Sequence, residues 1–408
     1  MTISINHKFT ETLIIGSGIS GLTCGNILEK EKKDFLIIDK NNKVGGRVQS
    51  DYLDGFILDK GFQVYLTDYS LGKKFLNYSN LNFCFFKPGA KIYKNSNFYN
   101  ISDPLKNPQE LHKTLFSPLA SFSDKLKILY LKNLLSKFDN DDFLNDKDMS
   151  TKEYLKKFGF SLKFINDFFV PFFGGVFLEN ELTTSSSFFK FVFSKFSKGS
   201  VVIPKKGMQE IPNQLYNNIS DEKVILNTKV VSLDNNKAII NDGTFIEFKK
   251  LVLAGDINDV NPRMIKYNSV KCFYFVCDEK ISNDKYIHLF PEDDLINNVV
   301  FINNISPSYA PNDVSLLSIS LIGNFLKTEN LIKIIQNKIS KIYRINLNKI
   351  HFLKKYEIDK ALPHQSIGYF ERSFKPSKDY FFSGDHTTHS SIEGAMLSGK
   401  RIADRLIN

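Results

Sequence analysis

The sequence has no tryptophan, only four cysteines among 408 residues, and no run of 18 apolar residues. Four cysteines in a chain of this length do not form a disulfide framework, which favours a reducing, intracellular setting. The lack of a long apolar run argues against a membrane-spanning helix. Residues 1–10 contain no apolar signal core, so we expect a cytoplasmic protein without a signal peptide.

Motifs of several other protein classes are also missing. There is no zinc-ligand spacing, RNA-binding aromatic motif or basic helix followed by heptads, and the 54 lysines and arginines are dispersed along the chain. We therefore assign the net charge of +10 to a lysine-rich solvated surface and expect no nucleic-acid partner. No Ser-His-Asp set or metal cluster is recognisable, so no metal site is predicted.

Phenylalanine is abundant, with 38 copies, in a sequence that is also rich in lysine, asparagine and isoleucine. The codon usage of an AT-rich genome explains most of this excess, so the phenylalanine content alone does not establish an apolar binding site. The apolar share of 42% and the charged share of 24% are typical of a soluble globular protein. The length allows one large or two ordinary domains.

The middle of the chain shows a change from helical to β patterns. Residues 105–196 are expected to be mostly helical, with a polar loop at residues 139–148. Short strands are expected at residues 223–226, 230–233, 238–240, 245–248 and 251–254. Cys272 and Cys277 lie five positions apart in a strand-like run, so we expect them to point to opposite faces.

The N-terminal region is predicted to form a β-α-β unit. Residues 12–15 and 35–38 are short apolar runs typical of buried parallel strands, and residues 19–30 between them have a helical pattern. The turn Gly16-Ser17-Gly18-Ile19-Ser20-Gly21 fits the G-x-G-x-x-G spacing of a dinucleotide-binding loop. In such a loop the glycines permit the tight turn, the approach of a pyrophosphate and close packing of the helix.

Two further features follow this unit. Asp39 ends the second predicted strand, where a carboxylate can accept hydrogen bonds from a ribose hydroxyl. Gly45 and Gly46 then precede Arg47; a glycine pair lets the main chain approach a flat or phosphorylated ligand, and a guanidinium can bind a phosphate oxygen. A nicotinamide enzyme has no need of this second element. The simpler alternatives are a capped turn for Asp39 and a surface ion pair for Arg47.

Together with residues 54–63, 204–208 and 382–396, these motifs resemble the FAD-dependent amine oxidase superfamily, which includes amine oxidases, protoporphyrinogen oxidase, and phytoene and carotenoid desaturases. The resemblance implies an α/β fold, with a Rossmann-like FAD-binding domain of the p-hydroxybenzoate-hydroxylase and glutathione-reductase type and an inserted α+β substrate domain. The implied FAD-binding domain comprises residues 1–66, 201–260 and 356–408. The implied substrate-binding domain comprises residues 67–200 and 261–355.

The resemblance also implies which residues bind FAD. Residues 54–63 look like the loop that runs close to the flavin ring, Val230 matches the position whose backbone contacts adenine, and Asp385 matches the acidic residue that bonds the ribityl or pyrophosphate portion. Backbone N–H groups at the start of the last helix would face the flavin N1–C2=O edge. The predicted FAD-binding residues are Gly16, Gly18, Ser20, Gly21, Asp39, Lys40, Gly45, Gly46, Arg47, Gly61, Phe62, Gln63, Val230, Gly384, Asp385, Ser391 and Ile392.

The sequence departs from the family pattern in two respects. The usual glutamate at the ribose position is Asp39, which has a shorter side chain. No cysteine follows Cys277, so the cysteine that tethers the flavin in some amine oxidases is missing and FAD is expected to be non-covalent. His386 and His389 lie near the C-terminal motif; a histidyl link is the less favoured alternative to their being loop residues.

The sequence assigns no catalytic residue and leaves the substrate site open. His364 and Gln365, before the last predicted strand, are candidates for the active site, against the simpler interpretation of a connecting loop. Phenylalanines in residues 168–177 and 188–196 predict either an apolar tunnel for a polyene, porphyrin-like or lipid substrate or ordinary helix packing, and packing is favoured. Lysines around the second segment, namely Lys190, Lys195 and Lys198, could meet lipid phosphates, although solvated lysines are commoner. Peripheral membrane contact is therefore left open.

The leading hypothesis is an FAD-dependent oxidoreductase that removes hydride from a hydrophobic small molecule, in the manner of phytoene desaturases or protoporphyrinogen oxidases. The electron acceptor is unknown, with oxygen and a quinone as candidates, and the single dinucleotide fingerprint disfavours a second, tightly bound NAD(P)H. The alternatives are a flavin amine oxidase, a carotene isomerase that uses reduced FAD, and a flavin-free prenyl-protein binder similar to GDP-dissociation inhibitors. The intact glycine loop and C-terminal motif argue against the last.

Overall fold

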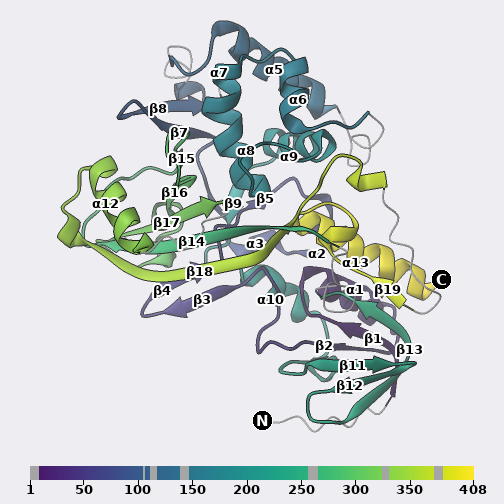
Figure 1. The fold of residues 1–408 in the computed structure, drawn as a ribbon. Coiled ribbons are helices and arrows are strands. Elements are labelled where there is room, and N and C mark those ends of the chain that lie inside the picture. Colours follow the sequence, from purple (N-terminus) through teal and green to yellow (C-terminus); the bar gives the residue numbers. More distant parts are fainter. Residues whose placement is uncertain are drawn as a thin grey trace.

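Two large sheets and a group of helices form the molecule (Figure 1). The computed structural model describes residues 9–103, 106–110, 117–137, 147–255, 265–323, 330–371 and 380–408. Most of the loop predicted at residues 139–148 and the domain boundary predicted after residue 260 lie outside the described residues.

The first sheet has seven strands, in the order β10-β2-β1-β13-β12-β11 with β19 also paired to β13. β10, β2, β1, β13 and β19 run parallel, whereas β12 and β11 are antiparallel additions. The strands are β1 Phe9–Ile15, β2 Phe35–Ile38, β10 Val224–Ile225, β11 Val230–Asp234, β12 Lys237–Ile240, β13 Phe245–Leu253 and β19 Tyr380–Phe382. The beginning, middle and end of the chain therefore meet in one sheet.

The predicted β-α-β unit is confirmed, because α1 (Ile19–Lys30) connects β1 to the fully buried β2. The predicted last strand and last helix are also present, as β19 and α13 (Ile392–Ile407). The two strands expected at residues 245–248 and 251–254 are one strand, β13, and that prediction was wrong. β13 stays continuous because it pairs with β12 at its start and with β1 and β19 at its end.

The second sheet has seven strands in the order β18-β14-β17-β16-β15-β7-β8, all antiparallel except the β15–β7 pair. Its strands are β7 Gly89–Lys94, β8 Asn97–Ser102, β14 Tyr267–Cys277, β15 Ile287–Leu289, β16 Asn298–Phe301, β17 Ser315–Ile322 and β18 Ile350–Pro363. Cys272 and Cys277 of β14 belong to different hydrophobic clusters, so they point to opposite faces as predicted. The domain boundary predicted after residue 355 falls inside β18.

Helices predominate in the described part of residues 105–196, as predicted, and Figure 1 shows them at the top of the molecule. They are α5 Phe122–Ser136, α6 Thr151–Lys157, α7 Leu162–Phe164, the π-helical segment η3 Ile165–Phe169, α8 Val170–Phe177 and α9 Ser186–Lys198. Helix α12 (Leu331–Tyr343) packs against the second sheet through Ile335 and Ile339. None of the helices in the described ranges is long and apolar enough to cross a membrane.

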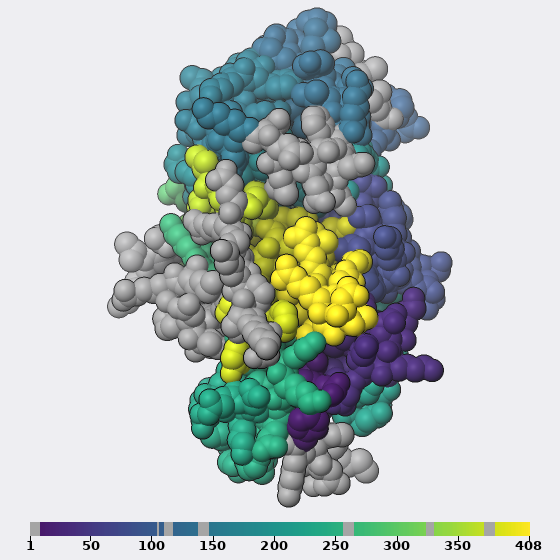
Figure 2. Space-filling view, turned by 90° about the vertical axis from the view of Figure 1, so that its right-hand side faces the viewer, coloured from purple at the N-terminus to yellow at the C-terminus, as the bar shows by residue number. Residues whose placement is uncertain are grey.

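Small elements join these parts. They are β3 Ser50–Leu53, β4 Phe56–Asp59, β5 Tyr65–Leu66, β6 Cys84–Phe85, β9 Val201–Ile203, α2 Ser70–Phe75, α3 Tyr78–Leu81, α10 Glu210–Tyr216 and α11 Ile302–Ile305. In Figure 2 the C-terminal segment, in yellow, lies between the purple and green segments below and the blue to teal helical segment above. Glu393 of α13 fixes this position, because its carboxylate accepts hydrogen bonds from the backbone N–H groups of Leu71 and Gly72 in α2.

Candidate cofactor and substrate cavity

A cavity of about 1890 Å³ extends from the first sheet to the helical group. Pockets for drug-sized ligands measure about 300–1,000 Å³, so this cavity has room for a dinucleotide and a second molecule. All but one of the 17 predicted FAD-binding residues line it, and the exception is Gly21. The structure thus brings the predicted residues together; their role as cofactor ligands stays a prediction.

The first glycine loop has the geometry expected for each of its glycines. Gly16 has a φ of +113°, and a Cβ there would lie 2.8 Å from the backbone N of Gly255. A Cβ on Gly21 would lie 2.0 Å from the carbonyl O of Gly16, so α1 can pack against the loop only without a side chain here. A Cβ on Gly18 would meet nothing within 4 Å, because this residue lines the cavity. The loop leaves open space where a pyrophosphate is predicted.

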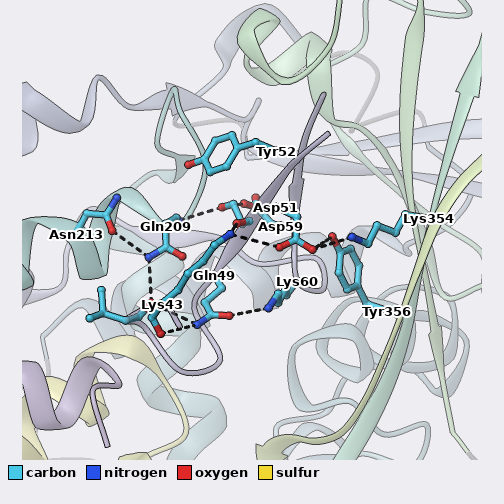
Figure 3. Close-up of polar contacts among 12 residues, drawn as sticks. Lys43, Gln49, Asp51, Tyr52, Asp59, Lys60, Gln209, Asn213, Lys354 and Tyr356 are labelled. Atoms are coloured by element: carbon cyan, nitrogen blue, oxygen red, sulfur yellow. Dashed lines mark hydrogen bonds and ion pairs between the residues drawn. The ribbon is translucent and has the colours of Figure 1, made fainter. Parts of the chain in front are cut away.

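The second glycine pair lies directly against the first loop. The backbone N–H of Gly45 donates to the carbonyl O of Ser17 at 2.8 Å, and a Cβ on Gly46 would lie 3.3 Å from the Cα of Gly18. Two glutamines that were not predicted from the sequence stabilise this turn. The side-chain amide groups of Gln49 and Gln209 both donate hydrogen bonds to the carbonyl O of Val44. Figure 3 shows this support, which also includes Lys60 Nζ donating to Gln49 Oε1 at 2.7 Å.

Asp39 is buried at the end of β2, and both its oxygens accept hydrogen bonds. Oδ2 accepts from the backbone N and the Oγ of Ser17, each at 2.7 Å, while Oδ1 accepts from the backbone N and the Nδ2 of Asn41, each at 2.9 Å. A carboxylate offers about four lone-pair sites. A ribose hydroxyl therefore has to displace the Ser17 hydroxyl or the Asn41 amide to reach Asp39.

Arg47 and Asp385 form an ion pair across 338 residues of sequence, with Arg47 Nη2 and Asp385 Oδ1 2.5 Å apart. Arg47 Nη1 also donates to the carbonyl O of Ala361 at 3.0 Å. Asp385 is buried, whereas the Arg47 side chain is 40% exposed, and both line the cavity. Arg47 was predicted to bind a phosphate, and Asp385 was predicted to bind the ribityl or pyrophosphate portion. The structure places these two residues in direct contact.

Two helix N-termini face the cavity. Gly18, Ile19 and Ser20 line it at the start of α1, and Ser391 and Ile392 line it at the start of α13. Each N-terminus presents unpaired backbone N–H groups and a partial positive charge, which stabilise a bound anion. The arrangement suits a pyrophosphate and a ring that becomes negatively charged when reduced.

The active-site candidates before β19 do not reach the cavity. Ala361 and Leu362 line it, but His364 and Gln365 do not. Gln365 is buried, with its Nε2 bound to the carbonyl O of Thr388 at 3.2 Å. Both residues follow Pro363, where β18 ends, so the cavity lining does not support their candidacy, which stays a prediction.

The two histidines of the C-terminal motif lie in different surroundings. His386 lines the cavity, whereas His389 does not and packs against Phe191 with ring centroids 4.1 Å apart. Burial lowers the pKa of His389 to about 3, so its imidazole is neutral. This position gives no support to a histidyl link through His389, and non-covalent binding stays a prediction.

The phenylalanine segments contribute both to helix packing and to the lining of the cavity. Phe169, Phe177 and Phe189 are fully buried and do not line the cavity, as ordinary packing predicts. Eight other apolar residues of these segments form a cavity wall on η3, α8 and α9: Phe168, Phe172, Phe173, Val176, Phe188, Val192, Phe193 and Phe196. Helix packing alone, the favoured interpretation, was therefore incomplete.

Two of the three lysines of α9 contradict both interpretations offered for them. Lys190 and Lys195 are only 5% and 6% exposed, so neither is solvated and neither can meet a lipid phosphate. Lys190 lies over the ring of Tyr154, and Lys195 forms an ion pair with Asp68. Lys198 is exposed and lines the cavity.

A buried carboxyl group supports the loop at residues 60–63. Asp59 is fully buried and accepts hydrogen bonds from Ser50 Oγ at 2.6 Å, the backbone N of Met208 at 2.9 Å and the Tyr309 hydroxyl at 2.9 Å. Burial raises the pKa of Asp59 to about 6, and these bonds only partly offset it. Asp59 was not predicted from the sequence, because no local pattern shows that this side of β4 is buried.

Asp59 gives a testable pH dependence. Because its pKa is higher in the folded state, its contribution to stability is complete below about pH 4 and is lost as the pH rises through about 6. Asp59→Asn stays neutral, so between pH 4 and pH 7 the unfolding free energy of the variant should improve relative to the parent by about 3 kcal/mol. Urea denaturation at both pH values measures the change.

Asp51 supplies the control for this prediction (Figure 3). Burial alone would raise the pKa of Asp51, but hydrogen bonds from Lys354 and Tyr356, each at 2.9 Å, outweigh it and lower the pKa. Asp51→Asn should therefore change relative stability in the opposite direction. A pH-independent difference between Asp59→Asn and the parent would contradict the account.

The two multi-stranded sheets around one cavity define a mixed α/β protein with the fold of FAD-dependent oxidoreductases. A sequence model of the family described as flavin-containing amine oxidoreductase matches residues 19–407. The chain belongs to this family.

Solved structures share the fold at low sequence identity. A candidate protoporphyrinogen oxidase from Exiguobacterium sp. 255-15 is 14% identical with a TM-score of 0.74, covering 97% of this chain and 98% of the other. An oxidoreductase from Methanosarcina mazei is 17% identical with a TM-score of 0.73, covering 97% and 100%. Putrescine oxidase bound to putrescine is 16% identical with a TM-score of 0.71, covering 98% and 99%.

A curated relative matches only in part. An uncharacterized protein in the nifH2 3′ region of Methanothermococcus thermolithotrophicus is 43% identical over 49 residues, which is 12% of this chain. The match spans about half (47%) of that relative's length.

Proposed function

We propose that the protein is an FAD-dependent oxidoreductase that removes hydride from a hydrophobic substrate, in the manner of the desaturase and protoporphyrinogen-oxidase branch of its family. The observation that carries this proposal is one cavity lined at one end by two glycine turns and two helix N-termini, and at the other by phenylalanines of α8 and α9. FAD, when bound, supplies the hydride-accepting chemistry.

The residues present fit this cofactor. The open space at Gly18 and the starts of α1 and α13 suit the pyrophosphate, and the Arg47–Asp385 pair lies between the two motifs. Gly61, Phe62 and Gln63 line the cavity beside Arg47, whose carbonyl O accepts a hydrogen bond from Gln63 Nε2 at 2.8 Å. These residues would hold the flavin ring and its ribityl chain.

Non-covalent binding is supported by the cysteines. Cys24, Cys272 and Cys277 are buried, and neither they nor Cys84 lines the cavity. A Rossmann-like FAD-binding domain formed by residues 1–66, 201–260 and 356–408, with the remaining residues as an inserted substrate domain, accounts for how distant segments share the first sheet. On this division the apolar wall of α8 and α9 belongs to the substrate domain, where it orients an apolar molecule and excludes water.

Anaerobic mixing tests the substrate class. With the flavin oxidised at the start, a polyene or porphyrinogen substrate should bleach its absorbance, and oxygen or a quinone should restore it afterwards. Release of peroxide with amines in air would instead indicate an amine oxidase. Flavin that no apolar candidate bleaches would contradict the proposal.

A further inference from the structure

Helix α5 presents apolar side chains to solvent, against the usual pattern of a surface helix. Its most exposed apolar residues are Phe122 (70%), Leu126 (52%), Leu129 (37%) and Tyr130 (61%). They occupy positions i, i+4, i+7 and i+8, which lie on one side of a helix. The buried residues of α5 are Asp124, Leu131 and Leu135, on the opposite side. An exposed apolar strip of this size marks an interaction site.

Leu162 of α7 is also 60% exposed. Its neighbour Ser161 fixes it beside the start of α5, because the backbone N and the Oγ of Ser161 donate to the buried Asp124 carboxylate at 2.8 and 2.7 Å. We call Phe122, Leu126, Leu129 and Tyr130 the exposed apolar face.

Lysines border the exposed apolar face. Lys127 of α5 donates to the carbonyl O of Gly159, beyond the end of α6, and Lys163 of α7 donates to the carbonyl O of Pro118 at 2.7 Å, close to the start of α5. Lys156 and Lys157, in the last turn of α6, are exposed, and the ring of Tyr130 lies 5.7 Å from that of Phe158 just after them. Apolar side chains surrounded by lysines are typical of surfaces that rest on anionic membranes.

The exposed apolar face continues into the cavity. Leu129 belongs to this face and also lines the cavity, together with Lys125, Ile128 and Lys132 of the same helix. A molecule held at the face therefore lies next to the wall formed by α8 and α9. An apolar substrate is concentrated in a bilayer rather than in water, so this position suits its transfer.

We propose that the exposed apolar face docks on a lipid bilayer that contains anionic lipid, with the lysines at the headgroups and the cavity facing the membrane. The docking itself stands on the exposed side chains alone. The transfer of substrate rests on the proposed function. This surface differs from α9, which the sequence suggested for lipid contact and whose lysines at 190 and 195 are buried.

Co-sedimentation with vesicles tests the docking on the full-length protein. We expect binding to vesicles of phosphatidylcholine with phosphatidylglycerol, weaker binding to phosphatidylcholine alone, and loss of at least about tenfold in partitioning for the double variant Phe122→Glu and Leu126→Glu. Lys156→Gln with Lys157→Gln should remove part of the preference for anionic lipid. Ile332→Glu is the matched control, because Ile332 is an exposed apolar residue (37%) on another helix.

Two results would overturn the docking proposal. In the first, the parent protein binds neither kind of vesicle. In the second, the Phe122→Glu and Leu126→Glu double variant binds as well as the parent protein. A change from dimer to monomer in that variant without vesicle binding would make the face a protein interface. Because both changed side chains are exposed, the thermal midpoint should stay near that of the parent. The flavin absorbance of the same samples reports the proposed function separately, so the two proposals fail independently.

Discussion

Replacing Gly21 by alanine is expected to disrupt both folding and flavin binding, whereas replacing Gly18 should disrupt binding alone. The Cβ of an alanine at position 21 would lie 2.0 Å from the carbonyl O of Gly16, so the loop or α1 has to move. Because the closest contact is with a backbone atom, which cannot move aside as a side chain can, we expect a loss of at least about 3 kcal/mol in unfolding free energy. Displacement of the loop would also remove the flavin.

Gly18→Ala is the matched comparison. Its added methyl group meets nothing within 4 Å and enters the space where the pyrophosphate is predicted, so the fold should be retained. Flavin affinity should fall by about tenfold or more, because the backbone can no longer approach the phosphates. Chemical denaturation and flavin titration of both variants measure the effects. A flavin-replete Gly21→Ala protein with parental stability would contradict the loop geometry.

The second large effect is expected at the Arg47–Asp385 pair. Arg47→Met leaves the Asp385 carboxylate buried without its cation, a change that costs about 3–5 kcal/mol for a fully buried pair. Because Arg47 is 40% exposed, we expect about 2 kcal/mol. If the guanidinium also binds a phosphate oxygen, flavin affinity should fall by about 10- to 100-fold.

A double variant separates the two roles of Arg47. Adding Asp385→Asn to Arg47→Met removes the uncompensated charge, so stability should recover while flavin affinity stays low. Denaturation curves and flavin titrations of the two single variants and the double variant complete the cycle. Recovery of flavin affinity in the double variant would show that Arg47 acts only by neutralising Asp385.

Features with a local sequence signal were predictable. The apolar runs of β1 and β2, the glycines at residues 16–21 and the amphipathic last helix each have a short-range pattern, and the structure contains all of them. The gathering of the glycine loop, residues 61–63 and the C-terminal motif on one cavity was predictable only through the family resemblance.

Features set by long-range contacts were not predictable. Asp385 pairs with Arg47, and Glu393 accepts a hydrogen bond from the start of α2. In each case more than 300 residues of sequence separate the two partners. Phenylalanines and lysines are intermixed along α9, so the sequence pattern does not indicate which side of the helix is buried. Lys190, for example, is buried over the ring of Tyr154. The apolar strip of α5 is exposed because the buried Asp124 side of the helix packs inward, which composition does not reveal.

The visible absorbance spectrum of the purified protein, followed by acid denaturation, tests the central claim most directly. We expect a yellow protein with about one FAD per chain, which denaturation releases into the supernatant because no covalent link holds it. A folded, colourless protein that also fails to bind added FAD would contradict the claim that both ends of the chain hold this cofactor in the cavity.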